Sequence, residues 1–236
     1  MIMRECEEMD NEERGEAGRG AAGIPALMFG GAFNPPTAAH IELAHYAMAA
    51  AGAECVIFVP SKASYVLHHQ GKNFSFTDEE RLEMLRRIAQ SRPWMRVSSY
   101  EIEAARQPRT YETLCHLREE GYAPRLLVGS DKLPELAHIW KYVDEMCREF
   151  GIVCLSRGGD DAERMIQEDP YLRQRSEYIT AVDAPLQYRE VSSTRVRELI
   201  GALRGKGDCS GDVLPGLREE LHSLICGELE GLEEWL

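Results

Sequence analysis

Short apolar runs alternate with helix-like segments along most of this chain. Such runs are typical of strands buried in a sheet, and they cover residues 26–29, 55–59, 95–98, 125–128, 152–155 and 177–182. Between them, a helix is predicted to begin at Thr77, with Glu80 three residues later as in a capping box, and another over 111–120 before Gly121. Further helices are expected over 193–204 and 214–226. The alternation predicts an α/β fold: a doubly wound, mostly parallel sheet with helices on both faces.

The two ends of the chain differ in composition from its middle. Residues 1–25 carry many glutamates and glycines and few apolar side chains, so we expect an acidic, poorly ordered tail there. Residues 26–236 are expected to form a single domain, because a chain of this length can bury one sizeable core. The part of this domain that begins near residue 191 is predicted to be a helical end.

The charge and the cysteines limit the partners and the compartment. A formal net charge of −13 over 236 residues disfavours nucleic acid or an anionic membrane as a partner. No apolar run is long enough to span a bilayer, and no signal-peptide core follows Met1. The seven cysteines are scattered without C-x-x-C spacing, which favours buried reduced thiols over a zinc site or disulfides. Together these features predict a cytoplasmic protein.

The stretch after the first predicted strand carries the strongest chemical signal. It reads Gly30-Gly31-Ala32-Phe33-Asn34-Pro35-Pro36-Thr37-Ala38-Ala39-His40. Glycines let a backbone pass close to a ligand, prolines fix φ before a helix, and Thr37 and His40 share one face of the first helical turn. Backbone N–H groups, a helix N-terminus and an imidazole would then converge, as is typical of a polyphosphate site. A glycine pair by itself would be an ordinary strand-to-helix turn.

A second stretch, near the C-terminus, has similar chemistry. Ser192, Ser193 and Thr194 offer hydroxyls and N-cap geometry at the start of a predicted helix. Arg195 and Arg197 place positive charge in its first turn, where the helix dipole disfavours a cation unless an anion lies nearby. Taken alone, the stretch also fits an ordinary N-cap followed by solvated arginines.

Together the two stretches resemble the signature of the nucleotidylyltransferases. Members typically carry Gly-x-Phe-Asp/Asn-Pro followed by His/Thr-x-x-His, and later Ile-Ser-Ser-Thr-x-x-Arg, whose arginine matches Arg197. Thr37 stands where many members have the first histidine, which leaves one titratable group fewer. The segments 110–114 (Thr-Tyr-Glu-Thr-Leu) and 127–140 (with Gly129, Asp131 and Trp140) resemble elements of the nicotinate mononucleotide adenylyltransferases. The resemblance spans about residues 27–225 and implies a Rossmann-like nucleotidylyltransferase fold.

The resemblance also implies a set of site residues. Catalysis would depend on His40, Arg197 and Thr37. ATP would be bound by Gly30, Gly31, Ala32, Phe33, His40, Lys62, Asp131, Ser192, Ser193, Thr194 and Arg197, and the pyridine mononucleotide by Asn34, Thr110, Tyr111, Thr113 and Trp140. Mg²⁺ would be held mainly by ATP phosphate oxygens, as this ion prefers, so no protein ligand to a metal is expected. Three of these residues also have ordinary alternatives: a solvated lysine at Lys62, a turn at Asp131 and a core aromatic at Trp140.

Other polar residues have less specific patterns. Arg81 matches a family arginine, but its place in a predicted helix favours an ion pair on the helix surface. The chain departs from the family at residues 64–70, where a loop is expected, and the role of His68 and His69 is left open. The remaining histidines lack metal-ligand spacing and are expected to be structural: His45, His116, His138 and His222.

The implied reaction is adenylyl transfer in NAD biosynthesis. The mononucleotide phosphate attacks the α-phosphorus of ATP and releases pyrophosphate, so catalysis comes from alignment and charge neutralisation rather than from a covalent nucleophile. Nicotinate mononucleotide is preferred here over nicotinamide mononucleotide as the acceptor. Two alternatives stay open: another nucleotidylyltransferase, acting on pantetheine phosphate, a flavin or a cytidylyl acceptor, and a catalytically idle sensor of ATP or NAD. The oligomeric state is also open, including a homo-oligomer.

Overall fold

The sheet of this protein is parallel throughout the part that the structure describes. The computed structural model describes residues 23–70, 76–156 and 159–184. Within them the strand order is β3-β2-β1-β4-β5-β6, and every neighbouring pair is parallel. The bounds are Ile24–Gly31 (β1), Cys55–Pro60 (β2), Met95–Val97 (β3), Tyr122–Gly129 (β4), Ile152–Leu155 (β5) and Ile179–Val182 (β6). The predicted doubly wound α/β fold is therefore confirmed.

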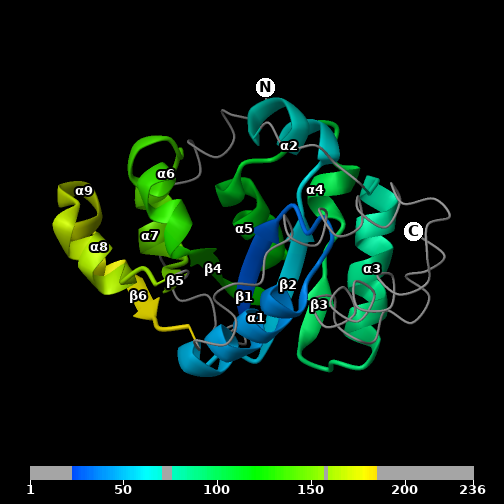
Figure 1. Cartoon of the computed structure of the whole chain (residues 1–236), viewed down its shortest axis with the longest axis horizontal. Helices are drawn as coiled ribbons and strands as arrows, with labels where there is room; N and C mark the ends of the chain where they lie inside the picture. The colour runs from blue at the N-terminus through cyan, green and yellow to red at the C-terminus, as the bar shows by residue number, and fades with distance from the viewer. Residues whose placement is uncertain (1–22, 71–75, 157–158, 185–236) are drawn as a thin grey trace, which may run out of the picture.

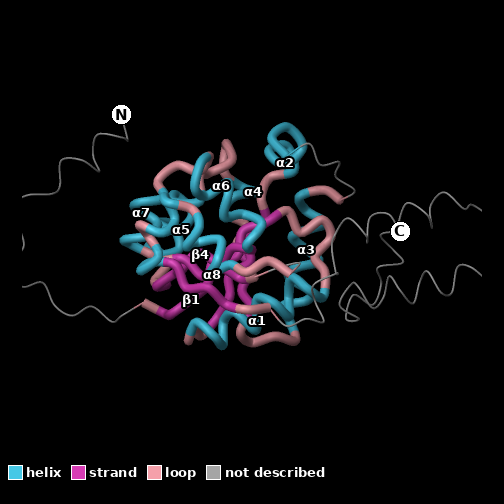
Figure 2. Tube along the Cα trace, turned by 60° about the vertical axis from the view of Figure 1, so that its left-hand side comes forward, coloured by secondary structure: helices cyan, strands magenta, loops and turns pink. Residues whose placement is uncertain are grey.

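Helices cover both faces of this sheet (Figures 1 and 2). Their bounds in the described residues are Ala38–Ala51 (α1), Ala63–Gln70 (α2), Asp78–Gln90 (α3), Tyr100–Glu103 (α4), Thr110–Glu119 (α5), Leu133–His138 (α6), Val143–Glu149 (α7), Ala162–Glu168 (α8) and Pro170–Arg173 (α9). The helices predicted from Thr77 and over 111–120 are confirmed, whereas those predicted over 193–204 and 214–226 lie outside the described residues. None of the described helices has the length and apolar character needed to cross a bilayer.

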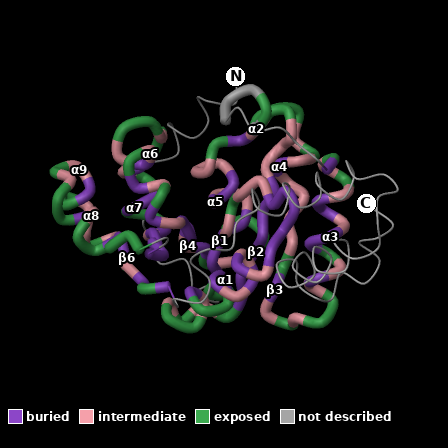
Figure 3. Tube along the Cα trace, viewed as in Figure 1, coloured by how far each residue is buried: buried purple, intermediate pink, exposed green. Residues whose placement is uncertain are grey.

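Alternate side chains of each strand enter two separate cores, one on each face of the sheet. Leu27 of β1 packs with Ile41 of α1 and Leu85 of α3 on one face. Its neighbour Met28 packs with Leu114 of α5 on the other face. This is the two-residue period of a strand buried on both sides, and Figure 3 shows the buried residues concentrated along the strands between the helices.

Three of the cysteines lie in or beside these cores. Cys55, Cys147 and Cys154 are buried free thiols, as expected from their apolar surroundings in the sequence. Burial raises the pKa of Cys147 to about 11 and that of Cys154 to about 12. At neutral pH these thiols are protonated and behave as small apolar side chains.

Two segments differ from the expectation. Residues 64–70 form most of helix α2 rather than a loop, because Asp78 Oδ1 accepts a hydrogen bond from the N–H of Ala63 at 2.8 Å and so caps the helix start. Strand β1 begins at Ile24, inside the predicted tail, because its N–H donates to the carbonyl of Gly121 at 3.0 Å. The rest of the predicted tail, residues 1–22, lies outside the described residues.

The strand order determines where a ligand can bind. From the central β1 the chain builds outward through β2 to β3, and then crosses to β4 on the other side of β1. Doubly wound sheets of this order bind ligands outside the carboxyl ends of the strands, where the order reverses. Here that point lies between the ends of β1 and β4, and both are followed by segments that the sequence marks as a nucleotide site.

Candidate active site

The loop between β1 and α1 turns over buried aromatic rings. Phe33 has φ 44° and is 2% exposed, and its ring lies edge-on to that of Phe29, with centroids 5.3 Å apart. A Cβ on Gly31 would approach the Phe33 ring to 3.2 Å, whereas the nearest described atom to a Cβ on Gly30 is Cε of Met28 at 3.5 Å. Packing inside the loop therefore favours glycine at position 31, a reason that the sequence pattern did not reveal.

Thr37 and His40 form a hydrogen-bonded pair at the start of α1. The backbone N–H of Thr37 donates to Nδ1 of His40 at 3.0 Å, and Oγ1 of Thr37 lies 2.7 Å from the same nitrogen. Because a backbone N–H can only donate, Nδ1 is an acceptor, and the neutral imidazole carries its proton on Nε2. His40 can thus offer an N–H donor to an anion at a helix N-terminus whose first turn has no acidic residue.

Asn34 connects the same loop to the segment before α3. Its side chain is 3% exposed, and Oδ1 accepts a hydrogen bond from the backbone N–H of Phe76 at 3.3 Å. Phe76 is itself buried and precedes Thr77, which caps α3 by accepting a hydrogen bond from the N–H of Glu80. The predicted contact between Asn34 and the mononucleotide stays a prediction.

Arg81 forms the expected ion pair within its helix, with Asp78, but its own side chain is buried, so the expected location on the helix surface is wrong. Its side chain is fully buried in the first turns of α3, where it donates hydrogen bonds to the carbonyls of Ala32 and Ser61 and pairs with Asp78. The position faces inward because its neighbour Leu82 and Leu85 one turn later are buried as well. Burial lowers the pKa of Arg81, and Asp78 opposes this shift. The guanidinium thus joins the loop after β1 to the loop after β2.

Lys62 follows β2 and is directed against the protein. Its Nζ donates a hydrogen bond to the carbonyl of Ile102, and its N–H donates to Oε1 of Gln107 at 2.9 Å. Next to it, the N–H of Ser61 donates to the carbonyl of Gly31 at 2.9 Å. The two loops at the carboxyl edge are therefore in direct contact, and the phosphate contact of Lys62 stays a prediction.

The first turn of α5 holds three of the predicted mononucleotide residues. Thr110 begins the helix and is partly exposed. Thr113 is fully buried, and its hydroxyl donates to Oε1 of Glu101 at 2.9 Å. The hydroxyl of Tyr111 donates to Glu149 at 2.9 Å, and burial and this hydrogen bond raise its pKa. In this structure Tyr111 and Thr113 contact other protein groups, and their ligand roles stay predictions.

The segment after β4 reaches the point where the strand order reverses. Asp131 is exposed in the 3-10 turn Ser130–Lys132 that directly follows β4. Ser130 beside it is fully buried and donates to Oδ2 of Asp160 at 3.0 Å. Trp140, farther along, is partly buried against the core that contains α5 and α7. The place of Asp131 fits the predicted nucleotide site, and the roles of Asp131 and Trp140 stay predictions.

The other half of the predicted ATP site belongs to the C-terminal part of the chain. Ser192, Ser193, Thr194 and Arg197 lie outside the described residues. Within the described part, the structure brings together the loops after β1 and β2 and places Asp131 at the same edge of the sheet. Two residues that the sequence pattern did not single out, Glu101 and Gln107, connect Lys62 to α5. A glutamate in a short polar segment gives no signal of burial, because most glutamates are exposed.

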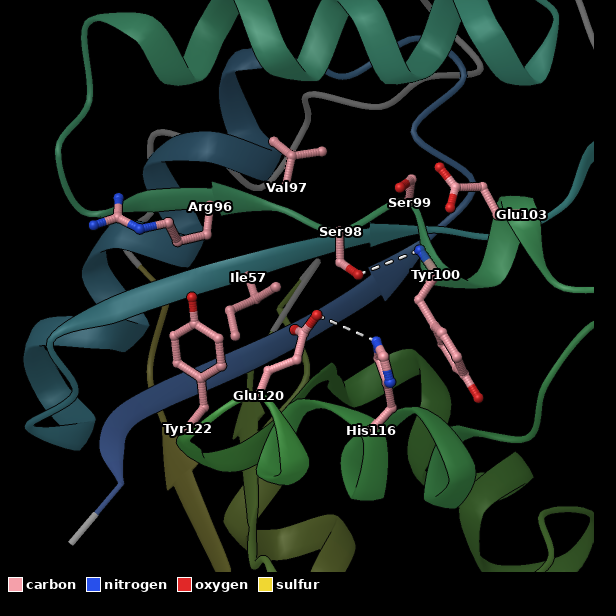
Figure 4. Close-up of a pocket in the computed structure, with 10 residues that line it drawn as sticks. All are labelled: Ile57, Arg96, Val97, Ser98, Ser99, Tyr100, Glu103, His116, Glu120 and Tyr122. Atoms are coloured by element: carbon pink, nitrogen blue, oxygen red, sulfur yellow. Dashed lines mark hydrogen bonds and ion pairs between the residues drawn. The ribbon is translucent and has the colours of Figure 1, made fainter. Parts of the chain in front are cut away.

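A separate cavity lies beside the sheet (Figure 4). Its volume is about 490 Å³, and its described lining includes none of the predicted site residues. Tyr100 of α4 and His116 of α5 stack across it with ring centroids 3.9 Å apart, and His116 pairs with Glu120 at 3.3 Å. These contacts agree with a structural role for His116, and we place no substrate in this cavity.

Comparisons with known proteins agree with the fold and the motifs. A family model described as cytidylyltransferase-like matches residues 28–199. A "probable nicotinate-nucleotide adenylyltransferase" of Clostridium tetani is 28% identical, over 84% of this chain and 94% of its own. A "nicotinamide/nicotinic acid mononucleotide adenylyltransferase 2" of Caenorhabditis elegans is 30% identical, over 74% and 86%. The solved Plasmodium falciparum nicotinic acid mononucleotide adenylyltransferase, complexed with NaAD, superposes with a TM-score of 0.63 at 15% identity, over 89% and 95%.

Proposed function

We propose that this chain, which belongs to the cytidylyltransferase-like family and within it to the nicotinate and nicotinamide mononucleotide adenylyltransferases, transfers the adenylyl group of ATP to nicotinate mononucleotide. The observation that carries this proposal is the β1–α1 loop, where the family match coincides with a helix N-terminus and a histidine whose proton is held on Nε2. The products would be the dinucleotide and pyrophosphate, a step of NAD biosynthesis.

The chain's own residues would act on the polyphosphate of ATP. His40 would donate its Nε2–H to a phosphate oxygen, and the backbone N–H groups at the start of α1 would contribute further donors. Thr37 would hold the imidazole in this tautomer. Because these donors are fixed before the substrate arrives, they stabilise developing charge without reorganising. Arg197, Ser192, Ser193 and Thr194 would complete the phosphate site from the C-terminal part of the chain.

The mononucleotide would lie beside the first turn of α5. The resemblance of residues 110–114 to a family element supports contacts from Thr110, Tyr111 and Thr113, and Asn34 and Trp140 would contribute from the neighbouring segments. Its phosphate would then attack the α-phosphorus of ATP directly, so the protein contributes alignment of the two substrates.

The divalent cation would enter this arrangement as part of the substrate complex. The described residues form no group of three metal-ligating side chains, and Mg²⁺ prefers phosphate oxygens and water. Bound to ATP, the ion would neutralise part of the polyphosphate charge. We propose no ligand from the protein.

The test is pyrophosphate release from Mg²⁺-ATP with nicotinate mononucleotide and nicotinamide mononucleotide in parallel. We expect pyrophosphate release with both the higher rate and the higher kcat/KM when nicotinate mononucleotide, rather than nicotinamide mononucleotide, is the acceptor. Equal rates would extend the substrate range, as the name of the Caenorhabditis elegans relative indicates for that protein. Release with neither acceptor, despite measurable ATP binding, would overturn the proposal in favour of another acceptor or an idle sensor. The proposal includes a cytoplasmic location.

A further inference from the structure

A chain of buried and partly buried hydrogen bonds connects the loop after β2 to the first turn of α5. The N–H of Lys62 donates to Oε1 of Gln107 at 2.9 Å, and Nε2 of Gln107 donates to Oε2 of Glu101. The other carboxyl oxygen of Glu101, Oε1, accepts from the hydroxyl of Thr113 at 2.9 Å. Glu101 is 4% exposed, and the hydroxyl of Ser61 is a further hydrogen-bond partner of its carboxyl group.

The orientation of each group in this chain follows from its chemistry. A backbone N–H can only donate, so the amide oxygen of Gln107 must face Lys62 and its NH₂ group must face Glu101. Glu101 then has to accept on that side, and it accepts from Thr113 on the other. A carboxylate is the group that accepts on both oxygens, and an unpaired buried partner would cost the full desolvation of a polar group.

We propose that Glu101 is a positioning residue for the adenylyl transfer, which holds the first turn of α5 in register with the loop after β2. The proposal depends on the proposed function, because it assigns the α5 turn to the mononucleotide and the β2 loop to ATP. Glu101 touches neither substrate in this assignment. It acts through Thr113 on one side and through Gln107 on the other.

The two ends of the hydrogen-bond chain depend on Glu101 to different degrees. Arg81 holds the loop after β2 independently, because it donates to the carbonyl of Ser61, and the N–H of Ser61 also donates to Gly31. The buried side-chain bond of the first α5 turn is the one from Thr113 to Glu101. Loss of this hydrogen-bond chain should therefore displace the α5 turn more than the β2 loop. Mononucleotide binding should then be weakened more than ATP binding.

The variant that disrupts this hydrogen-bond chain is Gln107→Glu. It keeps an acceptor for Lys62 but places a second carboxylate against Glu101, a repulsion that buried carboxylates avoid. We expect the KM for the mononucleotide to rise about tenfold, the value of one hydrogen bond to a charged group. The KM for ATP should stay within about twofold of the wild type, since Arg81 still holds its loop.

The double variant Glu101→Gln with Gln107→Glu exchanges the two groups and restores the donors and acceptors between Lys62 and Thr113. The amide introduced at position 101 would accept from Thr113 and donate to the carboxylate introduced at position 107, which still accepts from Lys62. We expect the KM for the mononucleotide to return to within about twofold of the wild type. The matched controls are Glu103→Gln, on the exposed end of the same helix α4 (Figure 4), and Gln174→Glu, also exposed; both should leave the KM unchanged.

A second variant, Thr113→Val, tests the proposal if Gln107→Glu does not fold. Thr113→Val removes only the buried hydroxyl and keeps the volume of the side chain, and we expect a rise of about threefold in the KM for the mononucleotide. An unchanged KM in both single variants, or a double variant no better than Gln107→Glu, would overturn the proposal. A purely structural role would lower thermal stability and the active fraction without changing the KM.

Amide hydrogen exchange separates this proposal from the proposed function. The first hydrogen-bonded amides of α5, residues 113–116, begin with the N–H of Thr113, which donates to the carbonyl of Arg109 at 3.1 Å. They should exchange about tenfold faster in Gln107→Glu than in the wild type, and at the wild-type rate in the double variant. This measurement requires no substrate. If the wild type releases no pyrophosphate, the proposed function fails alone; if exchange in this turn is unchanged, the positioning role of Glu101 fails alone.

Discussion

The loop after β1 and the α4–α5 segment both border the carboxyl edge of the sheet, but they are held in different ways. In the β1 loop the contacts of the predicted catalytic pair and of the loop glycine join near neighbours in the chain, Thr37 with His40 and Gly31 with Phe33. In the α4–α5 segment Gln107 is hydrogen-bonded to Lys62, which lies 45 residues earlier. The first region therefore combines contacts within its own sequence with distant ones, such as those from Arg81 to Ala32 and from Phe76 to Asn34, whereas the second depends mainly on the tertiary fold to bring its partners together.

The largest effect on activity is expected in the locally organised region. His40→Ala removes the Nε2–H donor, and we expect kcat to fall on the order of 100- to 1000-fold, as for other preorganised donors. Steady-state pyrophosphate release measures this change. His138→Ala, an exposed histidine on α6, serves as the control and should keep wild-type kcat. An unchanged kcat in His40→Ala would remove His40 from the mechanism.

The largest effect on stability is expected at Arg81, which links the two loops through α3. Arg81→Met leaves the carbonyls of Ala32 and Ser61 without this donor and removes the cation that pairs with Asp78, at a cost of about 3 kcal/mol. Urea unfolding measures the loss. The control is Arg87→Met on the same helix, whose partly exposed pair with Glu83 should contribute about 0.5 kcal/mol or less. Equal losses of stability in the two variants would contradict the role of Arg81 as a link between the two loops.

A smaller effect tests the packing inside the β1 loop. A Cβ on Gly31 meets the Phe33 ring at 3.2 Å, while one on Gly30 meets Met28 at an ordinary 3.5 Å. We therefore expect Gly31→Ala to lose about 1 kcal/mol more stability than Gly30→Ala, because buried rings resist displacement. Chemical denaturation of the two variants side by side gives this difference. A larger loss in Gly30→Ala would show that the Phe33 ring moves aside freely.

The smallest expected effect is a pH dependence of the free energy of unfolding that arises from Glu101 in the α4–α5 segment. Burial raises the pKa of Glu101 above its ordinary value of 4.5, and hydrogen bonds from Thr113, Gln107 and Ser61 oppose the shift without cancelling it. The folded state thus binds this proton more tightly than the unfolded state. Raising the pH from 4.5 through the folded-state pKa should therefore lower the stability of the wild type relative to Glu101→Gln.

The difference in unfolding free energy between the wild type and Glu101→Gln should be constant above the folded-state pKa and also below pH 4.5. In each of these ranges the folded and unfolded states carry the same charge on Glu101. Unfolding free energies of the wild type and Glu101→Gln across this pH interval measure it. A difference that does not change with pH would show that Glu101 titrates as an ordinary exposed glutamate. Glu103→Gln provides the reference for an exposed glutamate on the same helix.

The same contrast explains which parts of the fold could be predicted from the sequence. Buried parallel strands give continuous apolar runs, so β2 was found almost to the residue. Thr77 and Glu80 stand three apart, so the start of α3 was found as well. Helix α2 was missed because Asp78, which caps it, lies 15 residues after Ala63. No pattern over a few residues carries such a contact.

The residues of the candidate site also differ in whether local sequence could predict their contacts. The pair of Thr37 and His40 could be read from spacing, because both members lie in one helical turn. The burial of Arg81 and Glu101 could not, since each has partners on other elements and the sequence of its own helix is rich in charge. Charged residues are usually exposed, so burial of such a residue becomes visible only when the sheet and helices are assembled.

The clamp formed by Arg81 has a consequence for how this site can change over generations. It binds the main-chain carbonyls of Ala32 and Ser61, and a carbonyl is present at these positions whatever side chain stands there. The clamp therefore does not depend on which side chains stand at these two positions. A substitution at Ala32 or Ser61 would leave it in place, whereas an insertion or deletion that shifts either carbonyl would disconnect the two loops.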